Sequence, residues 1–298
     1  MRKLFVLLLT AMTCIMTGCA AREYDLPERV SFYREGELLL IGSEQLIAGC
    51  LMSGMPSADE EALKAAACVM STRMLYLLRH RELRSFNGAD ISADDLPLMY
   101  MTDMEAAEEY GPSFERYREK AQRAAEYGLS HVMTCGGEVI SPGLCLLSAG
   151  RTDADRPNHR AVPLSCDKEH AEYLSTSEFS PDEVRRRLTA LTGVGKLSGR
   201  CEEWFSGYSC STGGALKELR FGGCRVTGEQ LRDTFQLRST AVTISYTEGR
   251  FVFTCKGIGE NRGLSLNGAD HLADKGYSAQ QILDVFFSDI TLSPCGIS

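Results

Sequence analysis

The sequence predicts a mixed α+β domain, and three patterns support this prediction. A long stretch rich in alanine and methionine begins at a capping box over Ser57–Glu60, which is typical of a buried helix. Apolar runs flank Glu35–Gly36, Gly136–Gly137 and Glu248–Gly249, as expected of β-hairpins. A glycine-dense loop over 257–263 precedes two helical stretches. No internal repeat is present, so we expect one mixed domain rather than a repeat array.

The first residues have the pattern of a secretion signal. Arg2 and Lys3 precede a short apolar run over 4–9, which is too short to cross a bilayer as a mature helix. Gly18–Cys19 resembles a lipobox, in which the cysteine is acylated and becomes the new N-terminus. We therefore expect lipid on Cys19 and an extracytoplasmic lipoprotein anchored to the cell membrane. An ordinary signal peptide or a weak membrane anchor is the alternative.

The first half of the remaining chain should combine strands and helices. The expected elements are a strand pair over 30–41, the long helix ending near Leu78, a helix over 114–127, a hairpin over 131–140 and a strand over 144–147. Residues 80–112 are polar, irregular and acidic. We expect them to form a surface insertion.

The second half carries clear helix starts and one more hairpin. Ser180–Glu183 has proline at the first helical position, and Thr227–Gln230 and Ser278–Gln281 are capping boxes. Strands over 241–246 and 250–255 should pair. The predicted division is therefore a signal peptide (1–18), a lipidated cysteine with a polar tether (19–29) and a single mixed domain (30–298).

Composition excludes some classes of function. The formal net charge is −8, and removal of the signal takes away two positive charges, so the mature chain carries −10. The only dense basic run, Arg185–Arg187, lies in a helix that also holds acidic residues, which is typical of a solvated face. Because nucleic-acid binding needs clustered basic residues, we expect no nucleic-acid partner.

Four segments together resemble the stage II sporulation protein D (SpoIID/LytB) family. They are EQLIAGCLMSGMP (44–56) with EALKAAA (61–67), the stretch from Gly128 to SAGRT (148–152), LKELRF (216–221) to TGEQLR (227–232) with LRST (237–240), and GIGENRGLSLNGA (257–269). Their order and spacing cover nearly all of residues 38–292. The resemblance implies a lytic transglycosylase fold that acts on peptidoglycan glycan strands, and a role in sporulation.

The sequence departs from the family pattern at the positions that carry chemistry. The family's catalytic acid directly precedes Met-Pro, where this chain has Gly54. Glu260, Leu266 and Asn267 replace the histidine, glutamine and tyrosine of the C-terminal motif, and Ala66 replaces another glutamine. A transglycosylase needs a carboxylic acid to protonate the leaving oxygen, which glycine cannot do. We therefore expect weakened or lost catalysis.

The resemblance also indicates which residues should line the substrate groove. The candidates are Gly54, Lys64, Ser148, Glu260, Arg262, Ser265 and Asn267. Glu260 could supply a displaced acid. The acidic residues Asp59, Glu60 and Glu61 are better explained as first-turn residues favoured by the helix dipole.

Cysteine and histidine usage leaves three alternatives. Ten of the twelve cysteines remain once Cys14 leaves with the signal and Cys19 carries lipid, an even number that permits disulfides or free thiols. Some relatives bind zinc in the middle region, so zinc is a weak hypothesis here and we expect no other cofactor. The candidate ligands are His131, Cys135, Cys145, Cys166 and His170.

Two functional hypotheses follow from these patterns. The first is an envelope lipoprotein that remodels peptidoglycan with weakened transglycosylase activity. The second is a non-catalytic module that binds peptidoglycan or, like amidase enhancers, assists other cell-wall hydrolases. Trp204, Phe205 and Tyr208 form an aromatic cluster, for which core packing is expected and sugar stacking is the alternative.

Overall fold

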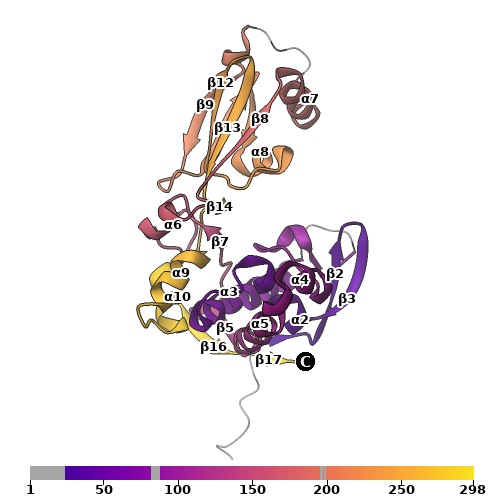
Figure 1. Ribbon diagram of the computed structural model, residues 1–298, viewed down its shortest axis with the longest axis vertical. Coiled ribbons are helices and arrows are strands. Elements are labelled where there is room, and N and C mark those ends of the chain that lie inside the picture. The colour runs from indigo at the N-terminus through magenta and orange to yellow at the C-terminus, as the bar shows by residue number, and fades with distance from the viewer. Residues whose placement is uncertain (1–23, 82–87, 195–196, 198) are drawn as a thin grey trace, which may run out of the picture.

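The computed structural model describes residues 24–81, 88–194, 197 and 199–298, which form two lobes (Figure 1). Residues 174–256 form the sheet lobe, and the described residues before and after this segment form the helical lobe. Each lobe has its own cluster of buried apolar side chains. The α+β fold class with a long buried helix and several hairpins is thereby confirmed.

Helices dominate the helical lobe and surround α3. Its helices are α2 (Ser43–Gly54), α3 (Glu60–Arg79), α4 (Asp103–Tyr110), α5 (Phe114–Leu129), α6 (Ser165–Glu169), α9 (Leu266–Ala273) and α10 (Ala279–Phe286), with 3₁₀ turns η3 (Ala93–Asp95) and η4 (Gly111–Ser113). In the described part of the chain, no helix combines the length and apolar character needed to cross a membrane.

Small sheets complete the helical lobe. Their strands are β1 (Asp25–Leu26), β2 (Arg29–Arg34), β3 (Glu37–Gly42), β4 (Ile91–Ser92), β5 (His131–Cys135), β6 (Glu138–Val139), β7 (Leu144–Leu147), β14 (Ile258–Gly259), β15 (Leu264–Ser265), β16 (Thr291–Pro294) and β17 (Gly296–Ile297). The strand orders are β3-β2-β4, β16-β5-β6, β14-β7-β15 and β1-β17. Through β7, strands β14 and β15 of the glycine-rich C-terminal segment are joined to the middle of the chain.

Helix α3 is the centre of the helical lobe. Its side chains are buried on several sides, and Leu63, Met70 and Met74 are wholly inaccessible to solvent. Burying a side chain of this size contributes roughly 1.5–3 kcal/mol, so the helix is held mainly by its neighbours. The helix begins after Asp59, whose carboxylate accepts a hydrogen bond from the Glu61 backbone N–H. The predicted capping box therefore lies slightly too early in the chain.

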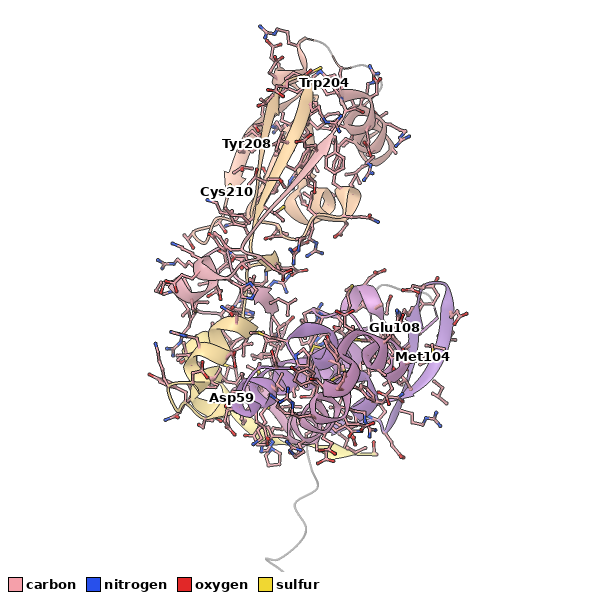
Figure 2. The ribbon with its side chains drawn as sticks, in the orientation of Figure 1. Asp59, Met104, Glu108, Trp204, Tyr208 and Cys210 are labelled. Carbon is pink, nitrogen blue, oxygen red and sulfur yellow. The ribbon has the colours of Figure 1, made fainter. Side chains whose placement is uncertain are left out.

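The sheet lobe packs two antiparallel sheets and two helices around aromatic side chains. Its elements are β8 (Leu174–Phe179), α7 (Pro181–Thr192), η5 (Cys201–Glu203), β9 (Phe205–Cys210), β10 (Leu216–Phe221), β11 (Cys224–Thr227), α8 (Gly228–Phe235), β12 (Val242–Thr247) and β13 (Arg250–Lys256), with strand orders β11-β10-β9 and β12-β13-β8. Trp204 and Phe205 are buried against Phe251, as expected of core residues. Tyr208 is 49% exposed on β9 (Figure 2).

Two segments differ from expectation. Residues 24–29, expected to belong to the tether, are fixed to the fold because β1 pairs with β17 and Leu26 is fully buried. Residues 88–112, expected within a surface insertion, contribute the buried Ile91 and Leu98 to the core. Isolated apolar side chains within polar segments account for both differences. The predicted signal, lipobox and Cys19 lie outside the described residues.

Helices α3 and α5 approach closely where α5 carries a glycine. A Cβ atom on Gly128 would lie 2.5 Å from the Ala67 carbonyl carbon, which is closer than real contacts allow. The nearest atoms of Ala67 belong to the backbone of α3 and cannot rotate away, so the two helices themselves would have to separate. Gly128 thus sets the spacing between the two helices.

We expect Gly128→Ala to lower the free energy of unfolding by about 1–3 kcal/mol, because overpacking forces the two helices apart. Glu119→Ala, at an exposed position of the same helix, is the matched control and should change it by less than about 0.5 kcal/mol. Urea unfolding followed by circular dichroism measures both. Equal stabilities for the two variants would contradict the close approach.

Candidate functional site at the junction of the lobes

Apolar side chains surround the position at which the resemblance expects a catalytic acid. Gly54 is the last residue of α2. A Cβ atom on Gly54 would lie 3.3 Å from Leu98 Cδ1 and 3.4 Å from both Leu146 Cδ2 and Leu266 Cδ2. Leu266 stands where a glutamine is expected, so two departures from the family pattern adjoin one another. The place that should hold an acid and a polar neighbour is lined by leucines.

A buried carboxylate beside this place gathers three of the candidate groove residues. Asp167 of α6 is fully buried, and its Oδ2 accepts from Ser148 Oγ (2.6 Å) and Ser265 Oγ (2.8 Å). Its Oδ1 accepts from Asn267 Nδ2 (2.9 Å), and the Ser148 backbone N–H also donates to Oδ2 (2.8 Å). These bonds offset the loss of hydration of a buried charge. The predicted residues therefore position one another.

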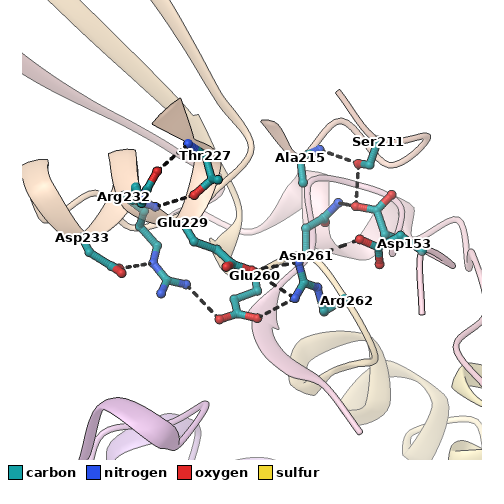
Figure 3. A network of polar contacts seen from close by, with 12 residues as sticks. Asp153, Ser211, Ala215, Thr227, Glu229, Arg232, Asp233, Glu260, Asn261 and Arg262 are labelled. Carbon is teal, nitrogen blue, oxygen red and sulfur yellow. Dashed lines mark hydrogen bonds and ion pairs between the residues drawn. The ribbon is translucent and has the colours of Figure 1, made fainter. Parts of the chain in front are cut away.

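A second buried carboxylate ties the glycine-rich loop to the sheet lobe (Figure 3). Asp153 accepts from Ser211 Oγ and the Gly213 backbone N–H, each at 2.6 Å, and from Asn261 Nδ2 at 3.0 Å. Asn261 Oδ1 in turn accepts from the Ala149 backbone N–H at 2.6 Å. Asn261 has φ +61°, a conformation that asparagine tolerates better than most residues.

Glu260, the proposed displaced acid, is held in ion pairs. Its Oε1 lies 3.4 Å from Arg232 Nη1 and its Oε2 lies 3.1 Å from Arg262 Nη1 (Figure 3). Arg262 also binds Glu229 at 3.2 Å and Asp155 at 3.8 Å. Each carboxylate oxygen of Glu260 is thus engaged by a guanidinium group, which is typical of a structural ion pair.

Lys64, another candidate groove residue, points to a different part of the molecule. Its Nζ lies 3.2 Å from Glu60 and 2.9 Å from Glu61, and 5.7 Å from the centroid of the Tyr127 ring. These contacts place Lys64 between α3 and α5. Figure 2 shows Asp59 at the start of α3, near α9 and α10, consistent with a role in helix capping. The contacts of Lys64 are therefore separate from those around Asp153 and Asp167, which form the junction of the two lobes.

The candidate zinc ligands are not brought together. Among the residues that the structure describes, no group of three or more His, Cys, Asp or Glu side chains is placed to hold a metal ion. The His131 Nδ1 lies 2.9 Å from the Tyr127 carbonyl oxygen, and the His170 Nδ1 accepts from the Glu172 backbone N–H. Cys145 is fully buried. The structure thus gives the zinc hypothesis no site.

The ten cysteines of the described part of the chain are all free thiols. Burial raises the pKa of Cys68 to about 12, and burial together with the charge of Asp167 raises the pKa of Cys145 well above its usual value. These two buried groups therefore stay protonated near neutral pH and are poor nucleophiles. Of the alternatives left open by the sequence, free thiols are the one observed.

Similarity to known proteins extends across most of the chain, although no family model matches it. Over 263 residues it is 24% identical to stage II sporulation protein D of Bacillus amyloliquefaciens and 21% identical to that of Bacillus subtilis strain 168. In both cases the match covers 84% of this chain and 74% of the relative. The similarity therefore includes residues from both lobes.

We expect Asp167→Asn to lower the free energy of unfolding by about 1–3 kcal/mol, because one amide N–H₂ group would face a buried donor. Asp25→Asn, at an exposed position, is the matched control. Chemical unfolding measures both. Equal unfolding free energies for Asp167→Asn and the control would show that the buried carboxylate does not stabilise the fold.

His159 provides a test of pH dependence. Its Nδ1 donates to the Pro157 carbonyl oxygen (2.9 Å) and its Nε2 accepts from the Gly143 backbone N–H (3.0 Å), so the folded state holds the neutral ring. Burial lowers the pKa of His159 below 6.5. The unfolded chain then binds a proton before the folded chain does, so this contribution to stability is present above pH 6.5 and declines as the pH falls below it.

We therefore expect the unfolding free energy of the unaltered protein to decrease between pH 7 and pH 5, with a slope from His159 of at most about 1.4 kcal/mol per pH unit. His159→Gln should reduce that slope, whereas His271→Gln, at an exposed position of α9, should leave it unchanged. Urea titrations at a series of pH values measure the slope. Identical slopes for the two variants would disprove the assignment.

Proposed function

We propose that this SpoIID-like protein acts at peptidoglycan as a divergent member of the stage II sporulation protein D family, and that its transglycosylase activity is lost or strongly weakened. The observation that carries the proposal is the set of leucines around Gly54. General acid catalysis contributes about 10²–10⁴-fold to reactions of this kind. A glycine among leucines supplies none of that factor.

Other carboxylates near the junction do not replace the missing acid. Glu260 is engaged by Arg232 and Arg262, while Asp153 and Asp167 accept hydrogen bonds from neighbouring donors and are buried. Each of these carboxylates is therefore engaged by donors of the protein itself. The geometry therefore favours a protein that binds the wall over one that cuts it.

The retained architecture supports a binding role. Ser148, Ser265 and Asn267 keep the glycine-rich loop against β7 through Asp167, so the junction is ordered although its acid is missing. We propose that the occupant of the junction is a peptidoglycan glycan strand and that other cell-wall hydrolases act beside the protein. Anchoring through lipid on Cys19 would hold it on the outer face of the cell membrane.

Incubation with purified sacculi tests the proposal. We expect the protein to pellet with the sacculi and to release no soluble anhydromuropeptides above a buffer blank, measured by chromatography and mass spectrometry. Glu260→Gln should behave in the same way, because Glu260 is held in ion pairs.

Release of anhydromuropeptides by the unaltered protein, together with its loss in Glu260→Gln, would identify Glu260 as a working acid and overturn the inactive interpretation. Failure of the folded protein to pellet would favour a surface lipoprotein without a wall role. A circular dichroism spectrum recorded on each sample ensures that only folded protein is compared.

A further inference from the structure

Two arginines face a pocket that the proposed function does not use. The pocket has a volume of about 670 Å³ and lies between α3, the β5–β6 hairpin and the loop after Asp155. Its walls include Arg73, Tyr76, Glu138, Ser141 and Arg156. Arg73 and Arg156 also line a smaller pocket beside Glu260, so both guanidinium groups belong to the same recess.

Among the described residues, neither arginine forms an ion pair within 4 Å. Arg73 Nη1 donates to Ser141 Oγ at 3.2 Å, and its Nε donates to the Asp95 carbonyl oxygen at 3.4 Å, so both acceptors are neutral. The described residues place no carboxylate within 4 Å of Arg156. The nearby Arg232 and Arg262 are different, because each is paired with Glu260.

Acidic residues lie near this pair without forming an ion pair with it: Asp94, Asp95 and Glu260 line the smaller pocket together with the two arginines. Burial and then the charge of Arg156 lower the pKa of Arg73, whereas Glu260 and Asp95 act in the opposite direction. Glu260 is already shared by two other arginines, and Glu138 is exposed on the pocket wall. The charge of Arg156 still acts against that of Arg73, and an anion bound between the two guanidinium groups would relieve this repulsion.

We propose that Arg73 and Arg156 form a binding site for an oxyanion, either a carboxylate or a phosphate group carried by a ligand in this pocket. The guanidinium fork suits both groups, because it donates two parallel hydrogen bonds to their oxygens. Ser141 and Tyr76 provide neutral polar contacts beside the arginines. This site stands on the two arginines and does not depend on the proposed function.

Calorimetric titration with inorganic phosphate and with N-acetylmuramic acid tests the site and separates the two sources. N-acetylglucosamine, which has a similar ring without the carboxylate, is the neutral control ligand. We expect one of the anions to bind and the neutral sugar not to bind. Arg156→Gln should weaken that binding about tenfold or more, as expected for loss of a charge-assisted hydrogen bond.

Arg186→Gln, which removes an exposed arginine of α7 in the sheet lobe, is the matched control and should bind as the unaltered protein does. Without anion, Arg156→Gln should also melt at a higher temperature, because it relieves the repulsion on Arg73. Arg73→Lys keeps the charge and removes the fork, so it should bind more weakly. Absence of binding by both anions, or equal binding by Arg156→Gln and Arg186→Gln, overturns the site.

Discussion

The arrangement of the junction depends on the buried carboxylate of Asp167. It accepts from Ser148 at the end of β7, and from Ser265 and Asn267 at the start of α9. These elements come from distant parts of the chain, so side-chain contacts rather than a short loop hold them together. Because a buried charge left without donors is costly, the bonds fix the register of the glycine-rich loop against β7. The position of Leu266 beside Gly54 follows from that register.

The leucines around Gly54 make its surroundings unsuitable for a carboxylic acid. A glutamate at that position would need polar neighbours and room for its carboxylate, whereas Leu98, Leu146 and Leu266 offer only apolar contact. The change at residue 54 and the change at residue 266 are therefore parts of one packing arrangement. Restoring a single carboxylate would not recreate the environment in which it works.

The sequence could predict most of the fold because its local signals are strong. Capping boxes at Thr227 and Ser278 and the hairpin turn at Glu248–Gly249 agree with the structure. Buried segments within polar surroundings, such as Leu26 and Ile91, were missed because one or two apolar residues give no periodicity.

The candidate site was predictable in part. Ser148, Ser265 and Asn267 do lie together, but the residue that joins them, Asp167, sits in a polar segment with no motif. Lys64 was misplaced because the resemblance gives the position of a residue in the chain and not the direction of its side chain. The unpaired state of Arg73 depends on which acids other arginines occupy, and only coordinates reveal that.

The sheet lobe enters and leaves the rest of the molecule at neighbouring points. Leu174 pairs with Lys256 across β8 and β13, and the Gly257 backbone N–H donates to the Tyr173 carbonyl oxygen at 2.8 Å. The chain therefore enters and leaves this lobe of more than eighty residues at adjacent positions. Such a module can lengthen, shrink or exchange its outer strands over evolutionary time while the helices below keep their places.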